Sequence, residues 1–370
     1  MASPFAETAG KILDEAVDIQ QIPAPTFEEG NRSDHVYRRF KTAGLIRVEQ
    51  DGMHNVYGRI PGGDAPPVVV TAHLDTVFDS DTDLTVKRED GLIHGPGIGD
   101  NSLAVATLTG IKEIVDRLPG PPAGDIILAA NVCEEGLGDL AGIKAVFKRL
   151  SGENPRAYLV LEGLSVDRLY IRGVGSRRYK IRVNAKGGHS WSDFGETSAV
   201  HTLVRLGAKL TELPLPEKPK TTLNLGVIKG GRSVNTIADN AHILIDLRSE
   251  SAKSLERLVN EVKAVIQGFS ADGAVISLDP IGSRPAGGID PDAPLIRLCR
   301  QAYRELGLDE PLLKSGSTDA NIPFSNGVPA VCLGLTRGKN THLESEYIET
   351  RPFVTGIRIL SSVLRGIWDI

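Results

Sequence analysis

A run of three valines, Val68–Val70, followed by His73, is the feature that most limits how this chain can fold. Continuous apolar residues are typical of a strand inside a parallel sheet that helices cover on both faces. Such sheets place their functional groups just beyond the carboxyl ends of the strands, where His73 stands. Asp75 points to the same side and can fix the imidazole through its second nitrogen. On this segment alone, a structural histidine beside a solvated carboxylate is the commoner explanation.

Further apolar strands repeat this pattern along the chain. Strands are predicted over 125–132 and 157–162, and helices over 102–118 and 140–150. The order strand, helix, strand, helix, strand predicts an α/β fold with a mostly parallel central sheet and helices on both faces.

A different pattern occupies residues 177–285, where strands alternate apolar and polar residues. Alternation is typical of an antiparallel sheet with one face in water. The element order β-α-β-β-α-β predicts a ferredoxin-like α+β domain. A chain of 370 residues is long enough for two domains. We therefore predict a first domain in two parts, 1–176 and 286–370, with this domain inserted between them.

Composition limits the partners and the compartment. The 47 acidic and 42 basic residues give a net charge of −5, which argues against nucleic acid as a partner. Three scattered cysteines favour a reducing compartment over a disulfide framework. No apolar run is long enough to span a membrane, and the N-terminus lacks the features of a signal peptide. We expect a cytoplasmic protein with no membrane partner.

Acidic and imidazole side chains follow the other strand ends and loops of the first domain. They are Asp100, Glu134, Glu135, Glu162 and His342. Together with His73 they provide two histidines and at least three carboxylates, a set that suits two zinc-type divalent ions. One carboxylate must bridge the ions if they lie about 3.5–4 Å apart. A further carboxylate can take a proton from water that the ions have made acidic. The pair Glu134 and Glu135 fits this division, so the sequence predicts a dinuclear site.

Six short segments together resemble one enzyme family. They are His73-Leu74-Asp75, Gly97-Ile98-Gly99-Asp100-Asn101, Glu134-Glu135-Gly136, Glu162 at a strand end, Gly187-Gly188-His189-Ser190 and Thr341-His342. Over nearly its whole length the chain resembles the dinuclear zinc exopeptidase and deacylase family. That family includes glutamate carboxypeptidase, acetylornithine deacetylase, succinyl-diaminopimelate desuccinylase, aminoacylase and tripeptide aminopeptidase.

The resemblance implies a complete set of metal ligands. Asp100 would bridge two divalent ions, zinc in the first place and cobalt or manganese as alternatives. His73 and Glu162 would bind one ion, and Glu135 and His342 the other.

The resemblance also implies the roles of residues around the ions. Glu134 would be the general base and acid, and Asp75 would orient the zinc-binding His73. A cis peptide bond is expected between Asp100 and Asn101. The chain has Ser102 and Ala104 where the family usually has lysine and glycine. Neither position is a ligand, so this departure concerns helix packing rather than chemistry.

The inserted domain resembles a lid and dimerisation domain, which implies a homodimer formed through an edge strand. His189 would then polarise the substrate carbonyl in the neighbouring subunit's site, as an oxyanion donor. Arg248 resembles the clamp for a substrate carboxylate and Asn235 a second substrate contact. Gly316 and Ser317 belong to a small-residue loop that resembles the one near the substrate's terminal carboxylate.

The function that these observations predict is a zinc-dependent metallohydrolase, an exopeptidase or deacylase. It would cleave an amide bond of a small peptide or N-acyl amino acid, using water activated by two metal ions and Glu134 as general base. Glu162 favours a carboxypeptidase or deacylase, whereas the run 95–102 looks closer to tripeptide aminopeptidases. That peptidase is one alternative. The other is a non-catalytic metal- or peptide-binding module, which predicts a lost ligand or base, and none is lost.

Overall fold

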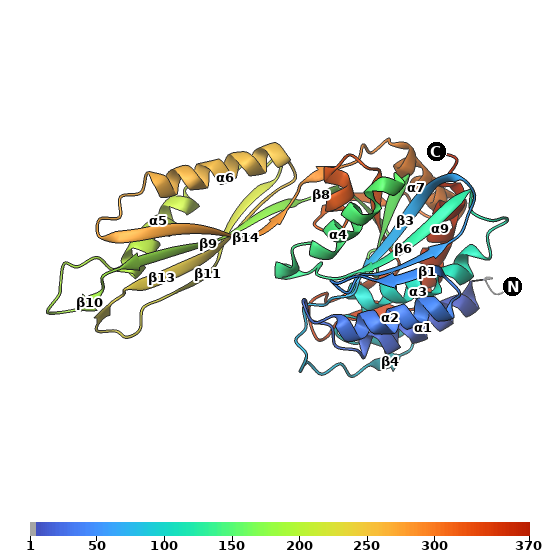
Figure 1. Cartoon of the computed structure of the whole chain (residues 1–370), viewed down its shortest axis with the longest axis horizontal. Coiled ribbons are helices and arrows are strands. Elements are labelled where there is room, and N and C mark those ends of the chain that lie inside the picture. Colours follow the sequence, from blue (N-terminus) through green and yellow to red (C-terminus); the bar gives the residue numbers. More distant parts are fainter. Residues whose placement is uncertain (1–4) are drawn as a thin grey trace. The chain divides into compact units, whose positions relative to one another are not determined.

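The computed structural model describes residues 5–370 and divides into two compact units (Figure 1). One unit contains the chain up to Gly173 together with Gly288–Ile370, and the other contains Val174–Gly287. The expectation that no signal peptide is present rests partly on residues 1–4, which lie outside the described residues. Among the helices of residues 5–370, none is long and apolar enough to cross a membrane.

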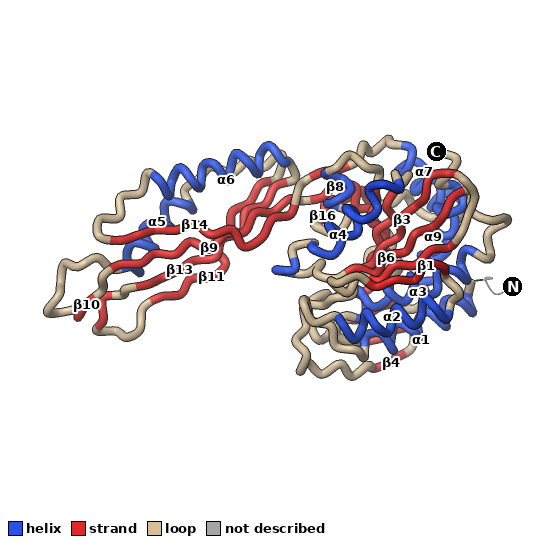
Figure 2. The backbone as a smooth tube through the Cα atoms, in the orientation of Figure 1, coloured by secondary structure: helices blue, strands red, loops and turns tan. Residues whose placement is uncertain are grey.

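A nine-stranded sheet forms the middle of the first unit (Figure 2). In spatial order its strands are β1 (Ile46–Gln50), β2 (Val56–Ile60), β6 (Gly124–Asn131), β3 (Ala65–His73), β7 (Ala157–Glu162), β17 (Ala330–Gly334), β8 (Arg168–Gly173) and β15 (Gly287–Gly288), while β16 (Leu312–Gly316) pairs with β8. Strands β6, β3, β7 and β17 are parallel neighbours. Their carboxyl ends therefore lie at one edge of the sheet, as the sequence predicts.

Helices cover this sheet on both faces. They are α1 (Ala6–Gln20), α2 (Gly30–Thr42), α3 (Leu103–Val115), α7 (Pro294–Glu305) and α9 (Arg351–Gly366) on one face, and α4 (Ala141–Leu150) and α8 (Asn321–Ser325) on the other. Val68 and Val70 of β3 pack in the first of these layers and Val69 in the second. Successive side chains of a strand point to opposite faces, so the valine run fills two cores at once. The predicted α/β fold class is confirmed.

The second unit is a four-stranded antiparallel sheet with two helices. In chain order it contains β9 (Gly175–Ala185), α5 (Ala199–Thr211), β11 (Thr221–Gly230), β13 (Asn240–Ser249), α6 (Ala252–Gln267) and β14 (Ala274–Arg284). The spatial order β11-β13-β9-β14 is that of a ferredoxin-like fold. Alternate residues such as Ile181, Val183, Ile243 and Ile245 form one core with both helices. This alternation gives the unit one packed face, as predicted.

Short strands complete both units. A small sheet of the first unit joins β18 (Gly338–Lys339), β19 (Tyr347–Glu349), β5 (Leu92–His94) and β4 (Lys87–Glu89). In the second unit, β10 (Gly188–His189) pairs with β12 (Thr236–Ile237). These pairs matter because they hold the loops that carry predicted site residues.

Candidate metal centre

The carboxyl edge of the large sheet brings the predicted ligands together. His73 is the last residue of β3 and Glu162 the last of β7, while Glu135 follows the end of β6. Asp100 lies in an irregular turn, η1 (Ile98–Ser102), which leads into α3. The peptide bond from Asp100 to Asn101 is cis, which confirms that expectation. Three strand ends and one turn thus converge on one point.

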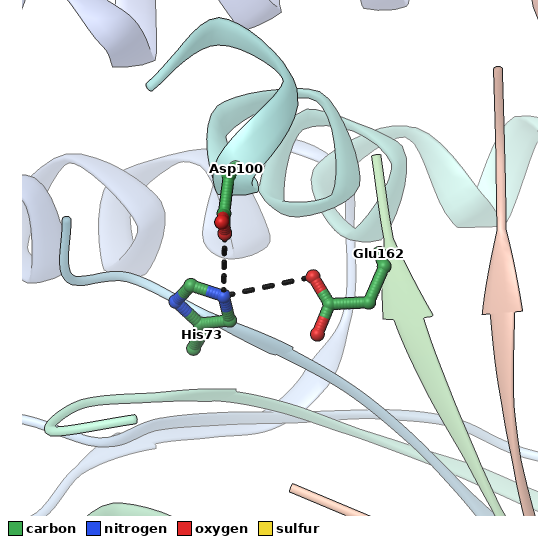
Figure 3. Close-up of side chains that lie close together, drawn as sticks. All are labelled: His73, Asp100 and Glu162. Atoms are coloured by element: carbon green, nitrogen blue, oxygen red, sulfur yellow. Dashed lines mark ion pairs between the residues drawn. The ribbon is translucent and has the colours of Figure 1, made fainter. Parts of the chain in front are cut away.

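One group of possible donors consists of His73, Asp100 and Glu162 (Figure 3). The Nε2 atom of His73 lies 3.1 Å from Oδ1 of Asp100 and 3.6 Å from Oε2 of Glu162. Figure 3 shows both carboxylates directed at the same ring nitrogen. His73 is 2% exposed, so this nitrogen faces the two carboxylates rather than solvent.

A second group consists of Asp100, Glu135 and His342. The Nε2 atom of His342 lies 3.1 Å from Oδ2 of Asp100 and 3.0 Å from Oε1 of Glu135. The two histidines thus approach different oxygens of the same Asp100 carboxylate. A shared carboxylate between two ligand groups is the arrangement that a bridged pair of ions requires.

The chemistry of these donors fits divalent cations of the zinc type. In each group, one imidazole nitrogen and two carboxylate oxygens lie within 4.8 Å of one another. Hydrogen bonds to Asp100 and Glu135 raise the pKa of His342 to about 10. Burial lowers the pKa of His73, but its contacts with Asp100, Asp75 and Glu162 outweigh this and raise that pKa well above the ordinary value. The carboxylates therefore create a strongly negative local field, which favours cations.

Asp75 links the first histidine to the Glu134–Glu135 segment. Its buried carboxylate accepts N–H bonds from Glu134 (2.9 Å) and Glu135 (2.8 Å) and an O–H bond from Thr26 (2.9 Å). Nδ1 of His73 lies 3.0 Å from the Asp75 carbonyl oxygen and 3.6 Å from its carboxylate. Asp75 thus lies beside the imidazole of His73, but the atom nearest to the ring is its backbone carbonyl oxygen. Its carboxylate instead binds the N–H groups of the segment that follows β6.

The sequence gives little indication of two supporting residues at the start of α2, Glu29 and Arg32. Arg32 is buried and donates to the carbonyl oxygens of Leu74 (2.8 Å) and Ile22 (2.7 Å). Glu29 is also buried and accepts the N–H of Cys133 (3.0 Å). In the sequence these look like ordinary polar residues at a helix start. Only their tertiary contacts show that Arg32 holds the segment after β3 and Glu29 the segment after β6.

The small-residue loop after β16 lies close to this edge. Asp319 accepts a hydrogen bond from the side chain of Asn131 (2.7 Å), and Asn131 is paired in register with His73. Gly316 ends β16 against Tyr170, where an added Cβ would lie 2.7 Å from the ring. Ser317 follows it.

Burial raises the pKa of Glu162 to about 7. The neighbouring His73 opposes this rise in pKa, whereas the negative charges of Asp100 and Asp319 add to it.

The second unit carries the other predicted substrate residues. Exposed His189 ends β10, and Asn235 precedes β12, so the β10–β12 pair brings them together. The Ser190 N–H donates to the Asn235 carbonyl (3.0 Å). Arg248, on β13, lies on another part of this unit and donates from Nε to Asp246 (2.6 Å). In this unit His189 therefore lies close to Asn235, whereas Arg248 lies apart from both.

Comparisons with known proteins identify the family of this chain. The model of peptidase family M20/M25/M40 matches residues 69–366. A succinyl-diaminopimelate desuccinylase of Paracoccus denitrificans is 28% identical over 314 residues, which cover 78% of this chain and 80% of that protein.

Solved structures show the same fold. A tripeptidase of Staphylococcus aureus superposes with a TM-score of 0.82 at 19% identity, covering 98% of this chain and 99% of that one. A dinuclear metal-binding M20 peptidase of Bacillus subtilis gives a TM-score of 0.72 at 14% identity, covering 98% and 99%.

Proposed function

The chain belongs to peptidase family M20/M25/M40, and we propose that it hydrolyses an amide bond of a small peptide or an N-acyl amino acid with two divalent ions, zinc in the first place. As a member of this family it is a metallohydrolase that acts on peptide or related linear amide bonds. The observation that carries the finer proposal is the pair of donor groups that share Asp100. In this proposal His73 and Glu162 would hold one ion, Glu135 and His342 would hold the other, and Asp100 would be the ligand common to both.

Glu134 is the residue that we assign to proton transfer. When bound, the two ions would acidify a water molecule and polarise the substrate carbonyl. Glu135 belongs to a donor group, whereas neither of the two groups contains Glu134. Glu134 is 5% exposed, and its N–H donates to Asp75, so its backbone is fixed directly next to the donor Glu135. It takes a proton from the attacking water and delivers it to the leaving amine.

His189 is the residue that we assign to the substrate carbonyl. Its Nδ1 accepts the N–H bonds of Trp191 (3.2 Å) and Ser192 (3.4 Å). Because Nδ1 is an acceptor, a neutral ring carries its proton on Nε2 and presents this N–H as a donor. Such a donor stabilises an oxyanion. The proposal includes substrate contacts by Asn235, Arg248, Gly316 and Ser317.

The second unit is proposed to act as a lid and to form a homodimer through its edge strand β11. Val227 and Ile228 on this edge are exposed, at 37% and 56%. An apolar, unpaired strand edge favours pairing with another chain. In such a dimer each His189 would serve the neighbouring subunit's site.

Mixing two inactive variants tests this sharing of sites. We expect His189→Ala and Glu134→Gln each to be nearly inactive alone. The co-refolded mixture should regain about a quarter of the activity of the unaltered protein, because half of its dimers are mixed and each mixed dimer has one intact site of two. Failure to regain activity in dimers shown to be mixed would contradict transfer of His189 between subunits.

The substrate class is tested with a panel of compounds. Acetylated and succinylated amino acids, dipeptides and tripeptides, each with free or blocked ends, should separate a deacylase or carboxypeptidase from the alternative, a tripeptide aminopeptidase. Chelation should abolish hydrolysis, and zinc, cobalt or manganese should restore it to different extents. A protein that binds two ions tightly but hydrolyses no member of the panel would support the non-catalytic alternative.

A further inference from the structure

A buried carboxylate that the mechanism above does not use lies four residues after His342. Glu346 is 0% exposed. Its Oε1 accepts the N–H bonds of Gly99 (2.7 Å) and Asp100 (2.8 Å), and its Oε2 accepts that of Gly97 (3.1 Å). Burying a carboxylate is costly unless hydrogen bonds replace water, and three backbone donors provide such bonds. The donors are the amides of the turn that carries the shared ligand.

The backbone of Glu346 makes a second connection between the same segments. Its carbonyl oxygen accepts the Gly95 N–H (2.9 Å), and its own N–H donates to the Leu343 carbonyl (2.9 Å). One residue therefore ties the segment 95–100 to the turn that follows His342. These two segments provide Asp100 and His342, which belong to the same donor group.

The close approach of the Glu346 carboxylate to the turn involves Gly99. A Cβ added at Gly99 would lie 3.0 Å from Oε1 of Glu346 and 2.8 Å from the Leu164 side chain. A larger residue at position 99 would therefore require the turn, the Leu164 side chain or the Glu346 carboxylate to shift. Glycine at this position allows the carboxylate to approach the amide of Asp100 closely.

We propose that Glu346 is a positioning residue that fixes the bridging Asp100 relative to His342 and thereby sets the affinity for the metal pair. The inference rests on the proposed metal centre. Metal–ligand distances tolerate only about 0.2 Å, so a ligand on an untethered turn binds less well. Outer residues that hold metal ligands typically contribute about 10–100-fold in metal affinity.

The test compares Glu346→Gln with a matched variant, Asp125→Asn. Glutamine has nearly the same shape, but it turns an amide N–H₂ toward one of the three backbone donors, so that hydrogen bond is lost. Asp125 also accepts a backbone N–H, that of Gly62 (2.8 Å), and pairs with Arg59 (2.7 Å), but at the opposite end of β6. Zinc affinity is measured for both full-length variants by competition with a chelating dye at fixed pH, together with thermal unfolding of the metal-free proteins.

Glu346→Gln should bind zinc about 10–100-fold more weakly than the unaltered protein, and saturating zinc should restore much of its activity. Asp125→Asn should keep the original affinity even if it unfolds at a lower temperature. Unchanged zinc affinity in Glu346→Gln would overturn the proposal. If that variant does not fold, Glu346→Asp, whose shorter side chain withdraws from the donors, decides by the same measurement. An unaltered protein that binds no zinc would instead overturn the proposed function, and this inference with it.

Discussion

Glu134→Gln is expected to lower kcat by about 10²–10⁴-fold while the protein keeps its metal ions. Glutamine preserves the size of the side chain and the backbone N–H that Asp75 holds (2.9 Å). It cannot take a proton from water, so the chemical step loses its base. Because Glu134 belongs to neither donor group, metal content measured by atomic spectroscopy should stay at the value of the unaltered protein.

The matched variant for this prediction is the neighbouring Glu135→Gln. Oε1 of Glu135 lies 3.0 Å from Nε2 of His342, so the same chemical change one residue later should weaken metal binding. Its activity should recover partly when metal is added in excess, whereas that of Glu134→Gln should not. Full activity in Glu134→Gln, or loss of metal from it, would contradict the division of roles between the two residues.

The strand-borne part of the site could be predicted from the sequence because strands carry strong patterns. The valines before His73 and the apolar run before Glu162 each identify a buried strand and its end. Once the strands are parallel neighbours, their last residues must meet at one edge. The fold class follows from the same patterns, and it is confirmed.

The loop-borne part could not be derived in this way. Cys133 and His342 have φ values of 56° and 67°, although sequence signals for such turns depend on glycine. The loops of Asp100 and His342 are connected by tertiary contacts such as the hydrogen bond from the Asp100 N–H to Glu346, which no local sequence pattern indicates. Their assignment rested on the resemblance to a family.

Side-chain patterns also give no indication of some strands and contacts. Strand β8 begins and nearly ends with arginine, and β16 is short, so neither has the apolar run that marked β3. The role of the Asp75 carbonyl depends on the backbone direction after β3, which side-chain periodicity does not encode. The proposed substrate contacts His189 and Asn235 lie in or beside β10 and β12, two-residue strands that are too short to show a periodic pattern.

Asp100→Asn is expected to abolish tight binding of both ions, because Asp100 is the one residue common to the two donor groups. Its Oδ1 lies 3.1 Å from His73 and its Oδ2 3.1 Å from His342. An amide offers one oxygen and a nitrogen that does not bind these ions, so it cannot replace both contacts. Metal content should fall from about two ions per chain to well below one, and activity with it.

His342→Ala is the control that distinguishes loss of the shared ligand from a general weakening of the site. That variant removes a ligand of one group and leaves His73, Asp100 and Glu162 in place, so it should keep about one ion per chain. The expected order of metal content is therefore the unaltered protein, then His342→Ala, then Asp100→Asn. If Asp100→Asn retained as much metal as His342→Ala, Asp100 would serve a single ion, and the two-metal centre would have to be replaced by separate sites.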